Sequence, residues 1–175
     1  MNQDKTTLKR ITTAHPFLRE ALLCIYLECI ALLTNPRVML RFSCVLRTPE
    51  EQDDLYSQGR HDNPGRIVTW VKKWFSFHQY GLAVDIVLLV DRDGNGTFES
   101  ASWDAAKDWD SDGVPDWLEV VEIFRKYGWD WGIITRSGKH IDKPHFQRTF
   151  GYTAAQLKKL PRDKEGYPVL FSKAA

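Results

Sequence analysis

Residues 76–90 read Ser-Phe-His-Gln-Tyr-Gly-Leu-Ala-Val-Asp-Ile-Val-Leu-Leu-Val. From Leu82 to Val90 the residues are apolar with one exception, and such a run predicts a central strand that is buried on both faces. The exception is Asp85, whose ionised carboxylate costs several kcal/mol to bury unless it is paired or bound to a metal. Asp85 is therefore a candidate metal ligand; the alternatives are an ion pair with an arginine or a position at a sheet edge.

The sequence on both sides of this strand alternates between helical and strand-like patterns. Thr48, Pro49 and Glu51 give an N-cap, a first-turn proline and a capping-box acid, and Gly128 gives a C-terminal stop for the helix before it. Helices are expected at residues 16–33, 49–58, 117–127 and 153–160, and further strands at 38–46, 129–135 and 145–149. With no repeat and no linker, residues 1–175 are predicted to form a single α+β domain.

Composition excludes several classes of partner. The 24 basic and 23 acidic residues nearly cancel, so charge alone does not favour nucleic acid or an anionic membrane. The apolar run at 21–33 is too short to span a bilayer and contains Glu28, so no membrane insertion is expected. The N-terminus lacks the apolar core of a signal peptide, which predicts synthesis in the cytoplasm. We expect a monomer.

The three cysteines, Cys24, Cys29 and Cys44, are too few and odd in number for a disulfide framework. No two of them form a C-x-x-C pair, so a zinc site built from thiolates is not expected.

Two histidines complete a candidate metal site with Asp85. Gly81 permits a turn that folds His78 back beside Asp85. His145 follows Pro144, which stiffens a segment that also contains Asp142. Two imidazoles and one carboxylate form a three-ligand zinc site with a fourth position open for water, which is the catalytic type. A histidine alone is more often structural, so the hypothesis depends on the three residues together.

The chemistry expected of such a site is hydrolysis. Zinc lowers the pKa of its bound water and polarises a substrate carbonyl. Asp142 is the candidate base that takes the proton of the water and passes it to the leaving amine. Arg47 is the candidate partner of the developing oxyanion, and its alternative role is a surface ion pair.

The spaced motifs of this chain resemble the M15 zinc peptidases, which include D-alanyl-D-alanine peptidases and phage L-alanyl-D-glutamate endolysins. The family pattern S-x-H-x-x-G-x-A-x-D, followed later by D-x-x-H, is matched by Ser76, His78, Gly81, Ala83, Asp85, Asp142 and His145. Stretches 46–60, 64–69 and 143–147 resemble the L-alanyl-D-glutamate branch. The resemblance runs from about residue 15 to residue 160.

This resemblance implies a Hedgehog-like or D-Ala-D-Ala-peptidase-like domain, in which helices flank a small, mainly antiparallel sheet. It also implies roles for individual residues: zinc ligands His78, Asp85 and His145, base Asp142, substrate or oxyanion partner Arg47, and substrate-binding residues Ser76 and Gln52. The implied substrate is the peptide stem of bacterial peptidoglycan, cut between L-alanine and D-glutamate. The implied setting is a bacteriolytic endolysin that acts on the cell wall in the periplasm after release.

The chain departs from the branch at Ile133, where the usual motif has a second glycine after Trp-Gly. This departure bears on which bond is cut more than on the zinc chemistry. Two alternatives stay open: a D,D- or L,D-carboxypeptidase on the same scaffold, and a non-catalytic zinc- and calcium-binding module.

A second metal site is predicted within an acidic insert at about residues 91–119. The positions 1, 3, 5, 6, 9 and 12 of an EF-hand loop are filled by Asp108, Asp110, Asp112, Gly113, Asp116 and Glu119, with the Val114 carbonyl at position 7. Ser102 is expected to cap a short helix before this loop. Asp91, Asp93 and Asn95 begin a similar loop, but Ser102 stands at its twelfth position, which favours a turn without metal. Calcium is expected to order the insert and raise thermal stability.

Overall fold

Strand β2 (Ala83–Val90) is the central strand of the five-stranded sheet that the described residues form. The structure is a computed structural model that describes residues 3–60, 63–134 and 140–171. One edge of β2 pairs with β1 (Val38–Cys44). Along the other edge, the start of β2 pairs with β5 and the end of β2 pairs with β3. All four pairings, including that of β4 with β5, are antiparallel.

The remaining strands are β3 (Ser100–Ser102), β4 (Asp130–Ile134) and β5 (His140–Gln147). Every residue of β2 except Asp85 is buried, as the apolar run predicted. The expected α+β class and antiparallel sheet are confirmed.

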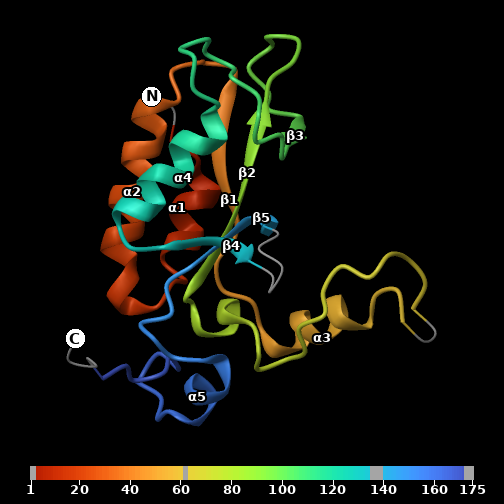
Figure 1. The fold of residues 1–175 in the computed structure, drawn as a ribbon, viewed down its shortest axis with the longest axis vertical. Coiled ribbons are helices and arrows are strands. Elements are labelled where there is room, and N and C mark those ends of the chain that lie inside the picture. Colours follow the sequence, from red (N-terminus) through yellow and green to blue (C-terminus); the bar gives the residue numbers. More distant parts are fainter. Residues whose placement is uncertain (1–2, 61–62, 135–139, 172–175) are drawn as a thin grey trace.

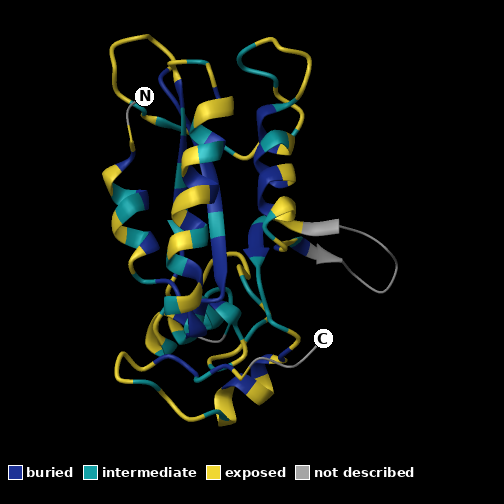
Figure 2. Cartoon of the chain, turned by 90° about the vertical axis from the view of Figure 1, so that its left-hand side faces the viewer, coloured by how far each residue is buried: buried dark blue, intermediate teal, exposed yellow. Residues whose placement is uncertain are grey.

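Three helices lie together on one side of the sheet (Figure 1). They are α1 (Lys5–Ile11), α2 (Arg19–Leu32) and α4 (Asp116–Lys126), and the short helix η1 (Pro16–Leu18) leads into α2. The buried faces of helices and sheet meet in one apolar core, visible as the dark blue positions of Figure 2. Among the described residues, no helix combines the length and the apolar character needed to cross a bilayer.

Helix α1 was not expected from the sequence. Asp4 begins it, because its carboxylate accepts hydrogen bonds from the backbone N–H groups of Thr6 and Thr7. The short polar pattern gave no amphipathic signal, and the helix is held by tertiary contacts: Asp4 also pairs with Arg41 on β1, at 2.9 Å.

Three further helical segments lie near the start of β2. They are α3 (Pro49–Ser57), η2 (Phe77–Tyr80) and α5 (Ala154–Lys159). Helix α3 has the predicted capping box, in which Thr48 and Glu51 each bond the other's backbone N–H. Figure 1 shows α3 and the segment after it extending away from the sheet.

Two sequence predictions were wrong in this part of the fold. The last strand, predicted at 145–149, is β5 from His140 to Gln147, so Asp142 lies within it. The helix predicted after Ser102 does not form; instead Ser100–Ser102 adds to the free edge of β2 as strand β3, opposite Leu88–Val90. Edge pairing with an exposed row of β2 backbone groups outweighed the capping tendency of one serine.

Candidate active site

Asp85 lies in a row of three residues that crosses the sheet. Its antiparallel partner on β5 is His145, and its partner on β1 is Cys44. Because directly opposite residues of neighbouring strands point to the same face, the register alone brings these side chains together. A register irregularity between Phe42 and Cys44 places the thiol opposite Asp85.

His78 reaches this row from the short helix η2. Gly81 ends that helix with φ 65°, and a Cβ there would lie 2.5 Å from the backbone N of His15, so only glycine fits the turn. The imidazole of His78 is buried, and its Nδ1 is 3.0 Å from the carbonyl oxygen of Val45. Since a carbonyl only accepts, Nδ1 carries a proton, and Nε2 faces Asp85 and His145.

The predicted ligand atoms form a nearly equilateral triangle. Nε2 of His78 is 3.1 Å from Oδ1 of Asp85 and 3.2 Å from Nδ1 of His145, and the third side is 3.0 Å. Ligands bound tetrahedrally to zinc lie about 3.3 Å apart, given bonds of roughly 2.0–2.1 Å. The outward nitrogen of His145 lies 3.1 Å from Oε1 of Gln147, as the outer N–H of a ligating histidine requires. These three residues therefore fit a zinc ion.

The charges of the cluster favour a cation at its centre. Burial alone would raise the pKa of Asp85, but His78 and His145 hold it well below its ordinary value. Burial would lower the pKa of His78, whereas Asp85 and Cys44 raise it to about 10. Positive charge between these groups is thus stabilised, whether as a proton on an imidazole or as a metal ion.

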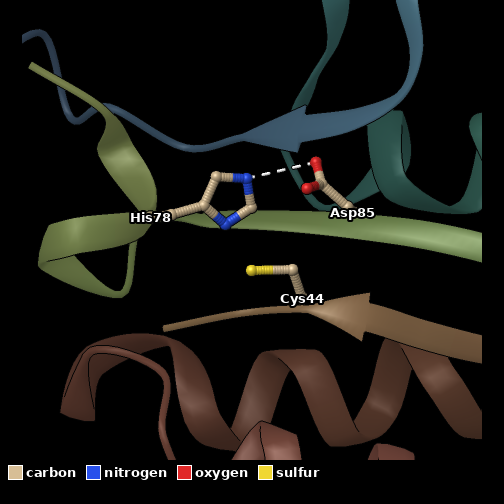
Figure 3. A group of neighbouring side chains, drawn as sticks. All are labelled: Cys44, His78 and Asp85. Atoms are coloured by element: carbon tan, nitrogen blue, oxygen red, sulfur yellow. Dashed lines mark hydrogen bonds and ion pairs between the residues drawn. The ribbon is translucent and has the colours of Figure 1, made fainter. Parts of the chain in front are cut away.

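Cys44 is a neighbour that sequence reasoning missed. Its thiol, His78 and Asp85 form a group whose potential ligand atoms all lie within 4.8 Å of one another, and Figure 3 shows the three side chains pointing toward one another. Burial would raise the pKa of this thiol, but His78 and Arg47 lower it overall. No spacing motif marks Cys44, because only the strand register brings it to the site.

Arg47 donates a hydrogen bond to the second carboxylate oxygen of Asp85. Its Nη2 donates to Oδ2 of Asp85 at 3.3 Å and to Sγ of Cys44 at 3.4 Å. Its Nη1 donates to Oε1 of Gln52 at 3.1 Å, and Nε2 of Gln52 donates to the carbonyl oxygen of Val71 at 2.6 Å. Gln52 is completely buried. The structure therefore places Arg47 between the predicted zinc ligand Asp85 and the buried Gln52.

Asp142 lies in an irregular part of β5. The pairing with β4 jumps from Trp131↔Phe146 to Ile133↔Ile141, so residues 142–145 bulge out of the β4–β5 ladder, while His145 stays paired with Asp85 of β2. Asp142 is exposed and has φ 61°, a left-handed conformation that is uncommon for residues other than glycine. Desolvation raises the pKa of this carboxyl above its ordinary value and Asp85 raises it further, although His145 opposes them.

The predicted base and ligands share one cleft of about 460 Å³. Arg47, His78, Asp85, Asp142 and His145 line it, together with Ser76. Leu55 of α3 also lines it, as do Val68, Thr69, Val71 and Phe75 of the segment after α3. The cleft is thus lined by both polar and apolar residues.

The residues predicted to bind calcium lie elsewhere. Asp108, Asp110, Asp112 and Val114 are in the connection before α4, and Asp116 and Glu119 are in its first turn. The backbone of Ile133 pairs with Ile141, but its side chain lies outside the described part of the structure.

A known protein family matches the segment that contains His78, Asp85, Asp142 and His145. Residues 70–148 match a peptidase M15 family model described as D-alanyl-D-alanine carboxypeptidase. The chain is 43% identical, over 101 residues, to the peptidoglycan L-alanyl-D-glutamate endopeptidase CwlK of Bacillus subtilis (strain 168). That alignment covers 58% of this chain and 55% of the relative, so the match spans about half the length of that protein.

A solved structure, the L-Ala D-Glu endopeptidase ChiX of Serratia marcescens, aligns with a TM-score of 0.46 and 20% identity. The alignment covers 83% of this chain and 88% of that one.

Proposed function

We propose, from the match of residues 70–148 to a peptidase M15 family model, that this protein is a zinc endopeptidase of bacterial peptidoglycan. The observation that carries the proposal is the triangle of His78, Asp85 and His145, with sides of 3.0–3.2 Å and both histidines bonded through their outer nitrogens. The proposed bond is that between L-alanine and D-glutamate, the bond named for the relative with 43% identity.

Zinc is the proposed cofactor of this site. When bound by the three ligands, it would polarise the scissile carbonyl and acidify a water molecule. Calcium, the second metal expected from the sequence, has its predicted ligands outside the cleft, so hydrolysis as proposed does not depend on it.

Asp142 is proposed as the catalytic base. Asp142 lines the same cleft as His145 and is not one of the three triangle residues. It would accept the proton of the attacking water and deliver it to the nitrogen of the departing D-glutamate.

Arg47 is proposed to have two roles. Its hydrogen bond to Oδ2 fixes the orientation of the Asp85 carboxylate, as an outer partner of a ligand does. Because the guanidinium also lines the cleft, it can balance the negative charge that develops on the carbonyl oxygen. Gln52 is proposed to position Arg47 rather than to touch substrate, and Ser76, which lines the cleft, to contact the peptide stem.

The proposed place of action is the cell wall, reached by an endolysin after its release from the cytoplasm. The second candidate activity is removal of a terminal D-alanine, and the description of the matching family model favours it. The two activities give different products from the same substrate.

The test is digestion of purified peptidoglycan by wild type, Asp142→Asn and Asp130→Asn, with mass analysis of the fragments. Asparagine suits the left-handed conformation of position 142 better than alanine does. Asp130 is exposed on β4 and is the matched control. We expect new L-alanine and D-glutamate termini from wild type and Asp130→Asn, and a roughly 100-fold or greater loss in Asp142→Asn with zinc retained.

Release of D-alanine alone would establish the carboxypeptidase instead. Peptidoglycan left intact by the zinc-loaded wild type would contradict both activities.

A further inference from the structure

The connection before α4 gathers carboxylates at the far end of β2 from the cleft. Asp108, Asp110 and Asp116 form one group, and Asp110, Asp112 and Glu119 form a second, each with potential ligand atoms within 4.8 Å of one another. The two groups share Asp110, so the five carboxylates lie in one cluster. Figure 1 shows this loop beyond the end of β2 that is opposite to η2.

Three of these carboxylate oxygens are buried without a hydrogen-bond partner. They are Oδ1 of Asp110, Oδ1 of Asp116 and Oε2 of Glu119. Asp116 is completely buried, and only its Oδ2 is bonded, to the backbone N–H of Trp109 at 2.7 Å. A buried anionic oxygen without a donor is strongly unfavourable, and a cation is the partner that satisfies several such oxygens together.

The electrostatics of Glu119 also indicate that a cation would stabilise this cluster. Burial is the largest cause that raises the pKa of Glu119, to about 7, and the neighbouring carboxylates, Asp112 first, raise it further. The ion pairs found within the described ranges include neither Asp116 nor Glu119. A protein that had no ion here would hold this group of acids together against their own repulsion.

In the similar loop at 91–99, as far as the structure describes it, no carboxylate oxygen is buried without a hydrogen-bond partner. Both oxygens of Asp91 accept backbone N–H groups, from Gly94, Asn95 and Gly96. Asp108 accepts backbone N–H groups in the same way, from Ser111 and Gly113, so the first acid of each loop does not distinguish the two loops. The 91–99 loop supplies the comparison for the experiment below.

We propose that residues 108–119 bind a calcium ion through the side chains of Asp108, Asp110, Asp112 and Glu119, the carbonyl of Val114, and Asp116 directly or through water. Oxygen-only ligands, a glycine with φ 98° at the turn and an acid at position 12 suit calcium better than zinc or magnesium. The proposal is independent of the hydrolytic activity proposed above.

The contacts of the loop indicate what the ion does. Oδ2 of Asp110 accepts from Oγ1 of Thr34 at 2.8 Å and from its N–H at 3.2 Å. The side-chain amide of Asn35 donates to the carbonyl of Trp109. Thr34 and Asn35 join α2 to β1, whereas Glu119 belongs to α4. The ion would therefore tie the α2–β1 connection to the first turn of α4.

The experiment uses the full chain, stripped of metal and reloaded with one equivalent of zinc. Calcium is then titrated while the melting temperature is followed, and terbium luminescence excited through tryptophan reports occupancy beside Trp109. The variants are Glu119→Gln, which removes the position-12 carboxylate, and Asp93→Asn, which removes an exposed acid of the other loop.

For wild type we expect a rise of roughly 5–10 °C at calcium 100-fold above its Kd, and a smaller rise with magnesium. Asp93→Asn should keep this rise and the terbium signal. Glu119→Gln should lose both, yet melt no lower than calcium-free wild type, because it removes a repelled charge. The absence of a rise in wild type, or its retention in Glu119→Gln, would overturn the proposal.

Discussion

Asp85 on β2 and His145 on β5 face each other across one antiparallel pair, with Oδ1 and Nδ1 3.0 Å apart. Two of the three proposed zinc ligands therefore lie on strands in the sheet, where register rather than loop conformation sets their separation. Substrate-side parts of the cleft come from loops and short helices instead. The proposed base Asp142 is on β5 as well, but in the part whose pairing with β4 is irregular. Ligand and base variants are therefore expected to behave differently.

Replacing Asp85 by asparagine should remove metal binding. The amide keeps the size of the side chain but removes the negative charge that pairs with His78 and Arg47. We expect zinc affinity to fall by roughly 100-fold or more and hydrolysis to fall with it. Zinc per chain after dialysis, measured by atomic absorption, is the readout. A variant that holds one zinc as tightly as wild type would refute the ligand assignment.

Position 142 should distinguish asparagine from alanine in stability as well as in activity. Its φ of 61° is tolerated by asparagine and disfavoured for alanine. Asp142→Ala should therefore lose about 1 kcal/mol of unfolding free energy relative to Asp142→Asn. Urea denaturation of the two zinc-free proteins measures the difference. Equal midpoints would show that the bulge does not constrain this residue.

Gln52→Leu should uncouple Arg47 from α3. Because Gln52 is buried and bonded to Arg47 and to the Val71 carbonyl, the variant should lose about 1–3 kcal/mol of stability. Its kcat should fall with little change in KM if Gln52 only positions Arg47. Glu50→Gln, on the exposed side of α3, should leave both constants unchanged. A raised KM with normal kcat would instead indicate direct contact with substrate.

The calcium effect should grow with pH. The pKa of Glu119 is about 7 in the folded chain and 4.5 ordinarily, so between these values the folded state holds a proton that the unfolded state has released. Without calcium, the unfolding free energy should therefore fall as pH rises from about 4.5 through 7. Calcium competes with that proton.

The rise in melting temperature on adding calcium should accordingly be larger at pH 8 than at pH 5.5. Glu119→Gln should show no such dependence. A larger rise at the lower pH would contradict the raised pKa of Glu119.

Local signals in the sequence predicted much of this structure. The apolar run gave β2, the capping residues gave α3, and the spacing of the motifs singled out His78, Asp85 and His145, which the fold brings together. Each of these signals is contained within a few neighbouring residues or in a pattern shared with a family.

The parts that the sequence did not reveal depend on contacts between distant segments. Cys44 reaches the site through strand register, and Val45 and Gln147 orient the imidazoles through a carbonyl and an amide that no motif marks. Similarly, β3 forms because β2 offers a free edge, and the early start of β5 is set by its pairing with β4.

Strand β2 also sets the distance between the two proposed cation sites. From Asp85 to Val90 it advances five residues, roughly 17 Å at about 3.3 Å each, and the 108–119 loop lies beyond its far end. That span is about twice the Debye length of roughly 8 Å at physiological ionic strength. The electrostatic interaction between the two proposed cations should therefore be weak. Filling one site should leave the titration of the other untouched, so the pH–rate profile of hydrolysis should be the same with and without calcium.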